Sequence, residues 1–490
     1  MTRRIRVIII GAGMAGILAA LKLKQRGDAD FIVYEKADGI GGTWKHNRYP
    51  GLACDVPAHA YTYSFAPNPD WSAIYAPGDE IRRYFEGIVD RYDIRPCIRL
   101  NQEVTQCEWG GGAWTVTLAD GHVDRADVLI AASGVLHHPN IPNIPGLRDF
   151  KGKVFHSAAW DDRASVDDIN VGVIGCGSTG VQIVSALSAR ARNLVHFCRT
   201  PQWIMPIRQR SYSEEERAAF RADEGTIDAL RYGEKYQAVL RRFEAAVTDP
   251  DSPEMAEIEQ IVRENLETSV KDEGLLKKLR PNYRAACKRL IFSGEYYDAV
   301  QRPGVTVETS EIEGIEPDGV HTRDGQFHPL HTLVLATGFA VDRFIRPTRV
   351  IGENEARLDD VWAGHPSAYY AVSVPGFPNF FMLNGPSGPV GNFSLIDVAE
   401  IQWQYVEQLL DLLIEGGVQD IAVTPRAFEA YERWRAAEAR HTVFATGCSS
   451  WYLDDQGIPN TWPKGLPEFR EAMARPLLED YQIRTSASGR

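Results

Sequence analysis

Two glycine-rich turns are the residues whose types and spacing most clearly predict chemistry. The first, Gly11-Ala-Gly13-Met-Ala-Gly16, follows the apolar run 7–10 and precedes a helical pattern. Its glycines allow the backbone to turn tightly and to approach a pyrophosphate, which would lie at the N-terminus of the helix. A second apolar run, 31–34, ends at Glu35, whose carboxylate can accept hydrogen bonds from ribose hydroxyls. This order of strand, glycine turn, helix, strand and acid predicts a dinucleotide-binding site.

The same pattern recurs 164 residues farther along the chain. The apolar run 171–174 leads into Gly175-Cys-Gly177-Ser178-Thr179-Gly180, a helical segment and the apolar run 194–197. Arg199 and Thr200 stand where the first unit has its acid, and an arginine can bind a 2′-phosphate that a carboxylate would repel. We therefore expect the second site to prefer NADP over NAD. Because two dinucleotide sites on one chain imply electron transfer between cofactors, NADPH as hydride donor and FAD as acceptor is the simplest assignment.

The elements that would hold these two sites predict an α/β fold. A length of 490 residues exceeds what one hydrophobic core usually holds, and 44% hydrophobic with 24% charged residues is typical of a folded globular chain. We expect two Rossmann-like dinucleotide-binding domains (FAD and NADP), a proline-rich linker near residues 139–145 and a helical insertion in the NADP domain. The predicted boundaries are residues 1–138 and 340–490 for the FAD-binding domain, 139–339 for the NADP-binding domain and 211–285 for the insertion.

Charge and cysteine content restrict the partners and the location. The 53 basic and 66 acidic residues give a formal charge of −13, which argues against bulk attraction to nucleic acid or to an anionic membrane. The seven cysteines include no CxxC pair, so free thiols in a reducing cytosol are expected rather than disulfides or zinc ligands. The apolar run 7–10 is too short for a secretory signal, and no HExxH motif or Cys/His cluster predicts a metal site. We expect a cytoplasmic protein that holds no metal.

Two longer motifs resemble the fingerprints of type I Baeyer–Villiger monooxygenases. The run 41–55, with Thr43, Trp44, Tyr49 and Asp55, matches the pattern (A/G)GxWxxxx(F/Y)P(G/M)xxxD. The pattern FxGxxxHxxxW(P/D) is matched at Phe150, Gly152, His156, Trp160 and Asp161. Related flavin-containing and N-hydroxylating monooxygenases usually carry Tyr or Phe in place of the tryptophan of this second pattern. The sequence of residues 55–71 is most similar to the 4-hydroxyacetophenone monooxygenase branch of the family.

The resemblance implies an FAD-containing, NADPH-dependent enzyme that uses O₂ to convert a ketone to an ester or lactone through a C4a-peroxyflavin. It implies that FAD is held by Gly11, Gly13, Gly16, Glu35, Thr43, Trp44, Asp55, Tyr61 and Val104. It implies that NADP is held by Gly175, Gly177, Ser178, Thr179, Gly180, Arg199, Thr200, Lys288 and Trp451. Lys288 would add a second cation at the 2′-phosphate, and Trp451 would cover the nicotinamide half of the cofactor.

Arg289 and Asp55 match the catalytic pair of the same family. A permanently charged guanidinium beside the flavin would keep the reacting peroxide anionic and then stabilise the oxyanion of the ketone adduct. Asp55 would orient Arg289 and partly balance its charge. The structural alternatives are a turn acid at position 55 and a surface basic pair at 288–289. We expect His156 to form a hydrogen bond across the domain interface and so to couple NADP binding to domain rotation; a purely structural histidine is the alternative.

Other functions stay open at this point. Oxygenation of a sulfide or amine by the same flavin intermediate is the first alternative. A flavin disulfide reductase would need a redox cysteine pair near the first helix, which the sequence lacks, and an NADP-sensing module would hold no flavin. We expect a small-molecule ketone and O₂ as partners, without nucleic acid or membrane, and a monomer or homodimer. The helical insertion and the aromatic stretch 61–71 are expected to shape a pocket for a bulky apolar ketone.

Overall fold

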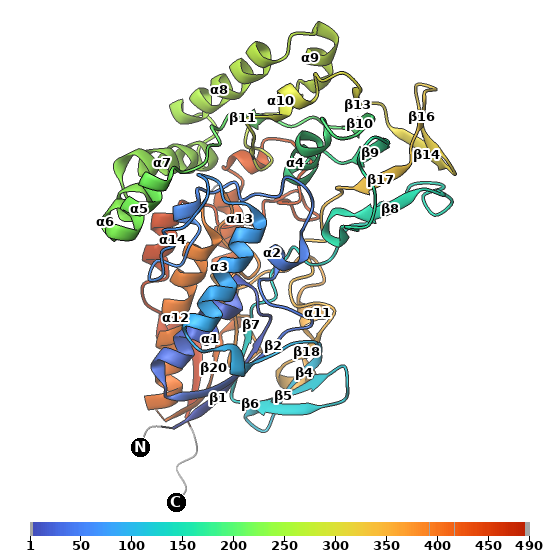
Figure 1. Ribbon diagram of the computed structural model, residues 1–490. Helices are drawn as coiled ribbons and strands as arrows, with labels where there is room; N and C mark the ends of the chain where they lie inside the picture. Colours follow the sequence, from blue (N-terminus) through green and yellow to red (C-terminus); the bar gives the residue numbers. More distant parts are fainter. Residues whose placement is uncertain (1–2, 392, 416, 486–490) are drawn as a thin grey trace, which may run out of the picture.

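Two parallel five-stranded sheets form the framework of the protein. The computed structural model describes residues 3–391, 393–415 and 417–485 (Figure 1). The first sheet consists of β1 (Ile5–Ile10), β2 (Ala29–Tyr34), β3 (Ile98–Arg99), β7 (Val128–Ala131) and β19 (Phe380–Met382). The second consists of β8 (Lys153–His156), β9 (Asn170–Ile174), β10 (Asn193–Phe197), β13 (Val305–Glu308) and β17 (Thr332–Leu335). Their strand orders are β19-β7-β1-β2-β3 and β13-β10-β9-β17-β8.

The two sheets repeat one arrangement, as the duplicated glycine turns predict. β1 lies between β2 and β7 in the same way that β9 lies between β10 and β17, and all four pairs are parallel. After each central strand the chain turns through the glycines into a helix, α1 (Met14–Arg26) or α4 (Ser178–Leu187). Both central strands are largely buried, which accounts for their continuous apolar sequences. The expected α/β class with two Rossmann-like units is confirmed.

The first sheet takes strands from both halves of the chain, whereas the second uses only residues 153–335. On the first sheet, α1 contacts α3 (Gly78–Arg91) and α12 (Leu395–Glu415), and α12 contacts β20 (Val418–Val423). The apolar faces of these helices form the largest core. The domain boundaries stay predictions, and residues 486–490 of the predicted FAD-binding domain lie outside the described residues.

The helical insertion lies between two short strands, β11 (Ile204–Met205) and β12 (Ile291–Phe292), which pair in parallel. Its helices are α5 (Glu214–Ala222), α6 (Glu224–Arg231), α7 (Glu234–Thr248), α8 (Pro253–Ser269) and α9 (Glu273–Leu279). They are the green and yellow-green helices in the upper part of Figure 1. Arg231, which is 5% exposed, donates to the carbonyl of Thr62 at 2.9 Å and to Asp397 at 2.5 Å. These bonds fasten the insertion to the first unit.

The remaining elements surround the two sheets. A four-stranded sheet contains β4 (Val104–Gly110), β5 (Ala113–Leu118), β6 (Val123–Ala126) and β18 (Arg349–Ile351). Smaller sheets contain β14 (Ile312–Glu316), β15 (Gly319–Thr322) and β16 (Phe327–Pro329), and β20 with β21 (Tyr481–Thr485). The other helices are α2 (Thr43–His46), α10 (Tyr296–Ala299), α11 (Leu358–Val361), α13 (Pro425–Ala439) and α14 (Leu466–Ala472). Within the described ranges, no helix has both the length and the apolar character needed to cross a membrane.

Two of the cysteines are joined, contrary to the expectation of free thiols. Cys287 and Cys448 are 161 residues apart in the sequence, yet their Cα atoms lie 6.2 Å apart and their sulfurs form a disulfide. The thiols at positions 54, 97, 107, 176 and 198 are free. The free-thiol interpretation is therefore wrong for this pair, because a cross-link between such distant segments leaves no local spacing signal.

Candidate active site

The glycines of the two turns let the backbone pack more closely than any side chain would permit. A Cβ atom on Gly16 would lie 1.8 Å from the carbonyl oxygen of Gly11, and one on Gly180 would lie 2.0 Å from that of Gly175. Gly11 and Gly175 have φ angles of +101° and +116°, which favour glycine. A Cβ on Gly177 would meet nothing within 4 Å, so this residue faces open space at the start of α4. The geometry fits a pyrophosphate at each helix N-terminus.

Glu35 is buried at the end of β2, where its carboxylate binds backbone groups of the first turn. It accepts hydrogen bonds from the N–H of Ala12 at 2.7 Å and from the N–H of Ala37 at 2.8 Å. A Cβ on Gly13 would lie 3.6 Å from the Cα of Gly42, so the turn packs against the first fingerprint. The carboxylate is thereby held beside the turn, where a ribose would lie.

Trp44 and Tyr61 form the aromatic part of the site on the side of the first unit. Thr43 begins α2, and Trp44 is the buried residue of this helix. The indole N–H of Trp44 donates to the hydroxyl of Tyr61 at 3.1 Å, and burial raises the pKa of Tyr61. Val104 begins β4, and its carbonyl accepts a hydrogen bond from the hydroxyl of Thr348 at 2.8 Å. A contact between Val104 and adenine stays a prediction.

Arg199 and Lys288 place two cations beside the second glycine turn. Arg199 is exposed after β10, and the carbonyl of Thr200 accepts a hydrogen bond from the thiol of Cys176 at 2.8 Å. The Nζ atom of Lys288 lies 4.7 Å from the ring centroid of Tyr283. Burial lowers the pKa of Lys288, and the charge of Arg199 lowers it further. Two neighbouring cations are most stable with an anion between them, so the pair fits the 2′-phosphate of NADP.

Helix α4 connects the two units. Ser178 and Thr179 form its first turn. The hydroxyl of Tyr49, in the first fingerprint, donates to Gln182 Oε1 at 2.9 Å and to Thr179 Oγ1 at 3.4 Å. Gln182 Nε2 in turn donates to the carbonyl of Ala53 at 2.9 Å. The first fingerprint is thus bound directly to the nucleotide helix of the second unit.

Arg289 and Asp55 are brought together from positions 234 residues apart. Arg289 Nη2 donates to Asp55 Oδ1 at 2.8 Å, Nε donates to Oδ2 at 3.1 Å, and Nη1 donates to the carbonyl of Gly391 at 3.0 Å. Burial acts to lower the pKa of Arg289, but the charge and hydrogen bonds of Asp55 together with the neighbouring Tyr452 and Cys54 outweigh it, and the pKa lies above its ordinary value. The guanidinium is therefore permanently charged and held in one orientation. Such a group can stabilise an oxyanion.

Tyr452 is the residue of this site that the sequence analysis missed. It is 3% exposed, and burial raises its pKa although the neighbouring charge of Arg289 lowers it. Trp451 is 53% exposed, and its ring centroid lies 4.1 Å from that of Tyr452. The motif predicts an aromatic residue here, but it does not show which of two adjacent aromatic side chains points inward. A role for Trp451 at the nicotinamide stays a prediction.

His156 joins the segments that enter and leave the second unit. Its Nε2 donates to the carbonyl of Gly338 at 3.0 Å, and its Nδ1 accepts from the N–H of Ala158 at 3.1 Å. Burial lowers the pKa of His156, which favours the neutral ring that these two bonds require. His156 thus links the segment that enters the second unit to the segment that leaves it. That it couples NADP binding to domain rotation stays a prediction.

The other residues of the second fingerprint make structural contacts. Phe150 is buried in the core of the second unit, and a Cβ on Gly152 would lie 2.3 Å from a backbone carbonyl oxygen. Trp160 is 6% exposed, with its ring centroid 4.9 Å from that of Phe155. Asp161 accepts a hydrogen bond from a backbone N–H two residues farther along at 3.0 Å. Together these contacts fix the backbone conformation of the segment that enters the second unit.

A cavity of about 650 Å³ opens beside the ion pair. Its walls come from both units and include Trp44, Asp55, Tyr75, Gln182, Phe292 and Glu295. None of its walls comes from residues 61–71 or from helices α5–α9. Tyr63 and Trp71 instead lie fully buried in the largest core. The two regions do not line this cavity, although residues 66–70 and Arg217 of α5 line another of about 550 Å³, so their role in a substrate pocket stays a prediction.

The chain is similar over almost its full length to proteins named as monooxygenases. A model of the flavin-binding monooxygenase-like family matches residues 4–216. An uncharacterized monooxygenase of Mycobacterium tuberculosis is 41% identical over 99% of this chain and 97% of its own length. A Baeyer-Villiger monooxygenase of Streptomyces coelicolor is 37% identical over 98% of this chain and 92% of its own. The structure of cyclohexanone monooxygenase from Rhodococcus sp. Phi1 bound to NADP+ has a TM-score of 0.88 at 30% identity, covering 99% of this chain and 100% of that one.

Proposed function

The chain belongs to the flavin-binding monooxygenase-like family as a type I Baeyer–Villiger monooxygenase, and from this premise we propose how its own residues perform the reaction. It is an FAD-containing, NADPH-dependent enzyme that converts a ketone to an ester or lactone. When bound, FAD takes a hydride from NADPH and uses O₂ to supply the oxygen atom that enters the ketone. The 4-hydroxyacetophenone branch, a cytoplasmic location and a monomer or homodimer remain part of the proposal.

The cofactor positions follow from the two glycine turns. FAD would lie on the first turn, with its ribose at Glu35 and its ring system beside Trp44 and Asp55. NADP would lie on the second turn, with its 2′-phosphate between Arg199 and Lys288. The open space at the second glycine of that turn and the closeness of the two cations support this assignment.

The observation that carries the mechanism is the Arg289–Asp55 ion pair. Arg289 holds a permanent positive charge on the edge of the cavity that Asp55 lines, while Asp55 and the carbonyl of Gly391 fix its plane. A fixed cation stabilises the negative charge on the reacting oxygen and then the oxyanion that forms on the ketone carbonyl. Lysine would supply the charge without the planar fork.

The ketone would occupy the cavity of about 650 Å³ between the two units. This volume lies within the usual range of small-molecule sites, and aromatic side chains from both units supply apolar walls. Because the cavity reaches Asp55, which binds Arg289, a carbonyl placed at that end of the cavity would lie close to the guanidinium. The aromatic walls favour a bulky apolar ketone.

The test is NADPH consumption by the FAD-loaded protein across a panel of cyclic, linear and aromatic ketones, with product mass measured. A product one oxygen atom heavier than the ketone, identified as an ester or lactone, is the expected result. A matched sulfide is supplied in a separate reaction. If every ketone is returned unchanged while the sulfide becomes a sulfoxide, heteroatom oxygenation replaces the proposed ketone reaction.

A further inference from the structure

The Cys287–Cys448 disulfide lies directly beside the residues of the proposed reaction. Cys287 immediately precedes Lys288 and Arg289 in the sequence, and Cys448 lies four residues before Tyr452. The bond therefore joins the segment that carries the ion-pair arginine to the loop that carries its buried aromatic neighbour. Both sulfur positions are shielded, with Cys287 at 0% and Cys448 at 5% exposure.

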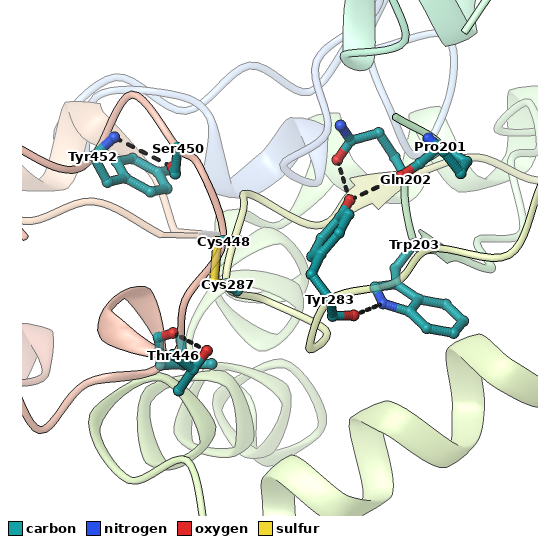
Figure 2. Close-up of a disulfide and its surroundings, with 10 residues drawn as sticks. Pro201, Gln202, Trp203, Tyr283, Cys287, Thr446, Cys448, Ser450 and Tyr452 are labelled. Carbon is teal, nitrogen blue, oxygen red and sulfur yellow. Dashed lines mark hydrogen bonds between the residues drawn. A yellow bond between two sulfur atoms is a disulfide. The ribbon is translucent and has the colours of Figure 1, made fainter. Parts of the chain in front are cut away.

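The segment on the first cysteine's side is anchored to the second unit. The hydroxyl of Tyr283 donates to the carbonyl of Pro201 at 3.1 Å and to Gln202 Oε1 at 2.7 Å (Figure 2). The indole N–H of Trp203 donates to the carbonyl of Tyr283 at 2.7 Å. Ala286 has a φ of +60°, a region that residues other than glycine rarely adopt. Its surroundings must hold this conformation in place, which makes the first cysteine a rigid attachment point.

The loop on the second cysteine's side, residues 446–462, is anchored differently at its two ends. Near its far end, Asn460 Nδ2 donates to the carbonyl of Pro366 at 2.7 Å. In the described chain, the backbone hydrogen bonds of residues 447–453 stay within the loop. Its near end is therefore attached by side-chain packing and by the disulfide, which Figure 2 shows crossing from the loop to the anchored segment.

The disulfide also holds one apolar cluster together. Tyr452 and Phe444, with ring centroids 4.7 Å apart, belong to the same cluster as Ala286, Leu290 and Met255. These residues come from three segments that are far apart in the sequence: the end of the chain, the segment after the insertion, and helix α8. Packing of this kind is sensitive to small displacements, because a gap of about 0.5–1 Å removes roughly a quarter to a half of the dispersion attraction between two atoms.

We infer that Cys287 and Cys448 are redox-dependent positioning residues, an inference that rests on the proposed function. While the bond is intact, it holds Tyr452 against the guanidinium of Arg289 and keeps the near end of the loop over the site. When the bond is reduced, this end is free to leave, water reaches the guanidinium, and NADPH is consumed with release of hydrogen peroxide in place of ester. Arg289 itself keeps its partner Asp55 in both states.

The redox step balances with reactants that the proposed activity uses. Formation of the bond removes two electrons and two protons from the two thiols, and O₂ accepts them and leaves as hydrogen peroxide. A dithiol reverses the step by thiol–disulfide exchange and becomes a cyclic disulfide itself. In a reducing compartment such a bond is usually transient and responsive to redox conditions.

The first experiment establishes the cross-link without using activity. Air-oxidised holoenzyme is alkylated, digested and mapped by mass spectrometry with and without prior treatment with dithiothreitol. The expected result is one cross-linked peptide pair containing positions 287 and 448, which dithiothreitol separates into two thiol peptides. Alkylated thiols at both positions in the air-oxidised enzyme would overturn the inference.

The second experiment measures coupling, the fraction of NADPH consumed that appears as ester. Oxidised wild type, dithiothreitol-reduced wild type and Cys448→Ser are compared, and Cys97→Ser, which changes a free thiol outside the site, is the control. Reduction and Cys448→Ser should each lower kcat for ester formation roughly 10-fold or more, because the site is misplaced. Peroxide release should rise, and the rate of flavin reduction by NADPH should fall much less than ester formation. Re-oxidation of the wild type should restore coupling.

The outcomes separate this inference from the proposed function. If oxidised wild type makes no ester from any ketone, the proposed function fails whatever the cross-link does. If wild type makes ester and both its reduced form and Cys448→Ser make it with equal coupling, the positioning role alone fails. Equal losses in flavin reduction and ester formation would indicate a merely structural bond and would also overturn it. If the bond in the folded enzyme resists dithiothreitol, the redox dependence is overturned, and Cys448→Ser then tests the positioning role alone.

Discussion

Arg289 has three hydrogen-bond acceptors around one guanidinium: the two oxygens of Asp55 and the carbonyl of Gly391. At the scale of single residues, different acceptors balance the charge of the guanidinium and fix its orientation. The carboxylate supplies a counter-charge, while the carbonyl fixes the plane of the fork without adding a second negative charge. Because arginine stays protonated at ordinary pH, none of these acceptors removes its proton, and the guanidinium acts as a fixed cation.

Arg289→Ala should bind FAD and accept hydride from NADPH but lose ester formation. Removal of a group that stabilises developing negative charge costs roughly 10²- to 10³-fold in rate. Stopped-flow reduction of the flavin and chromatography of the ester measure the two steps separately. Arg289→Lys keeps the charge and should fall between wild type and the alanine variant. Normal ester production by Arg289→Ala would remove the proposed role.

Arg199→Ala should raise the KM for NADPH roughly 10- to 100-fold, which corresponds to the loss of one or two charge-assisted hydrogen bonds. The KM for NADH, which lacks the 2′-phosphate, should change little. Steady-state kinetics with both nucleotides measures the difference. Arg192→Ala is the control, because this exposed arginine pairs with Asp168 away from the proposed phosphate site. Equal rises for both nucleotides would contradict a contact with the phosphate.

At the scale of the elements, the helical insertion braces the first unit. Arg231 ties α6 to α12 through Asp397, and Phe220 of α5 packs on His59, whose turn η1 (Ala58–Ala60) follows the first fingerprint. His59 is 2% exposed, and neither of its ring nitrogens has a hydrogen-bond partner among the described residues. This contact makes the docking of the insertion dependent on a neutral histidine.

The free energy of unfolding should therefore fall as the pH is lowered. Burial lowers the pKa of His59 from 6.5 to about 4, so between these values the unfolded chain binds more protons than the folded one. This histidine should account for a loss of roughly 3 kcal/mol between pH 6.5 and pH 4, shown as the difference between wild type and His59→Phe in urea titrations. His122→Gln, which changes an exposed histidine, is the control. If the free energy of unfolding depends on pH in the same way in wild type and His59→Phe, the pH dependence does not come from His59.

At the scale of the whole molecule, the two Rossmann-like units are joined by contacts that do not follow the chain. Tyr49 of the first unit binds helix α4 of the second, and the disulfide joins position 287 to position 448. A nucleotide bound between the units should therefore stabilise the assembly as one body.

NADP+ at 100 times its Kd should raise the free energy of unfolding by about 2.7 kcal/mol. It should also slow tryptic cleavage at Arg148 and Lys151, which are exposed in the segment that enters the second unit. Denaturant titration and timed digestion measure the two effects. NAD+ at equal concentration is the control, and it should protect much less because it lacks the 2′-phosphate. Equal protection by both nucleotides would place the phosphate elsewhere.

The sequence by itself determined the two glycine turns and the parallel units, and it predicted Arg199 and Lys288 as the cations of the second site. These features are encoded over short stretches, because a backbone that approaches a pyrophosphate tolerates no side chain at fixed positions and a buried parallel strand must be apolar throughout. The resemblance to the family also implied that positions 55 and 289 belong to one site, although their spacing alone contains no such signal.

Only the tertiary structure decided which side chains complete that site. Tyr452 is buried and its pKa responds to the charge of Arg289, whereas Trp451 is 53% exposed. The carbonyl of Gly391 supplies a third acceptor, and two cysteines 161 residues apart are joined. Each of these contacts depends on how segments from distant parts of the chain pack together. A local pattern specifies the conformation of its own segment, whereas the distance between two segments is set by the packing of everything that lies between them.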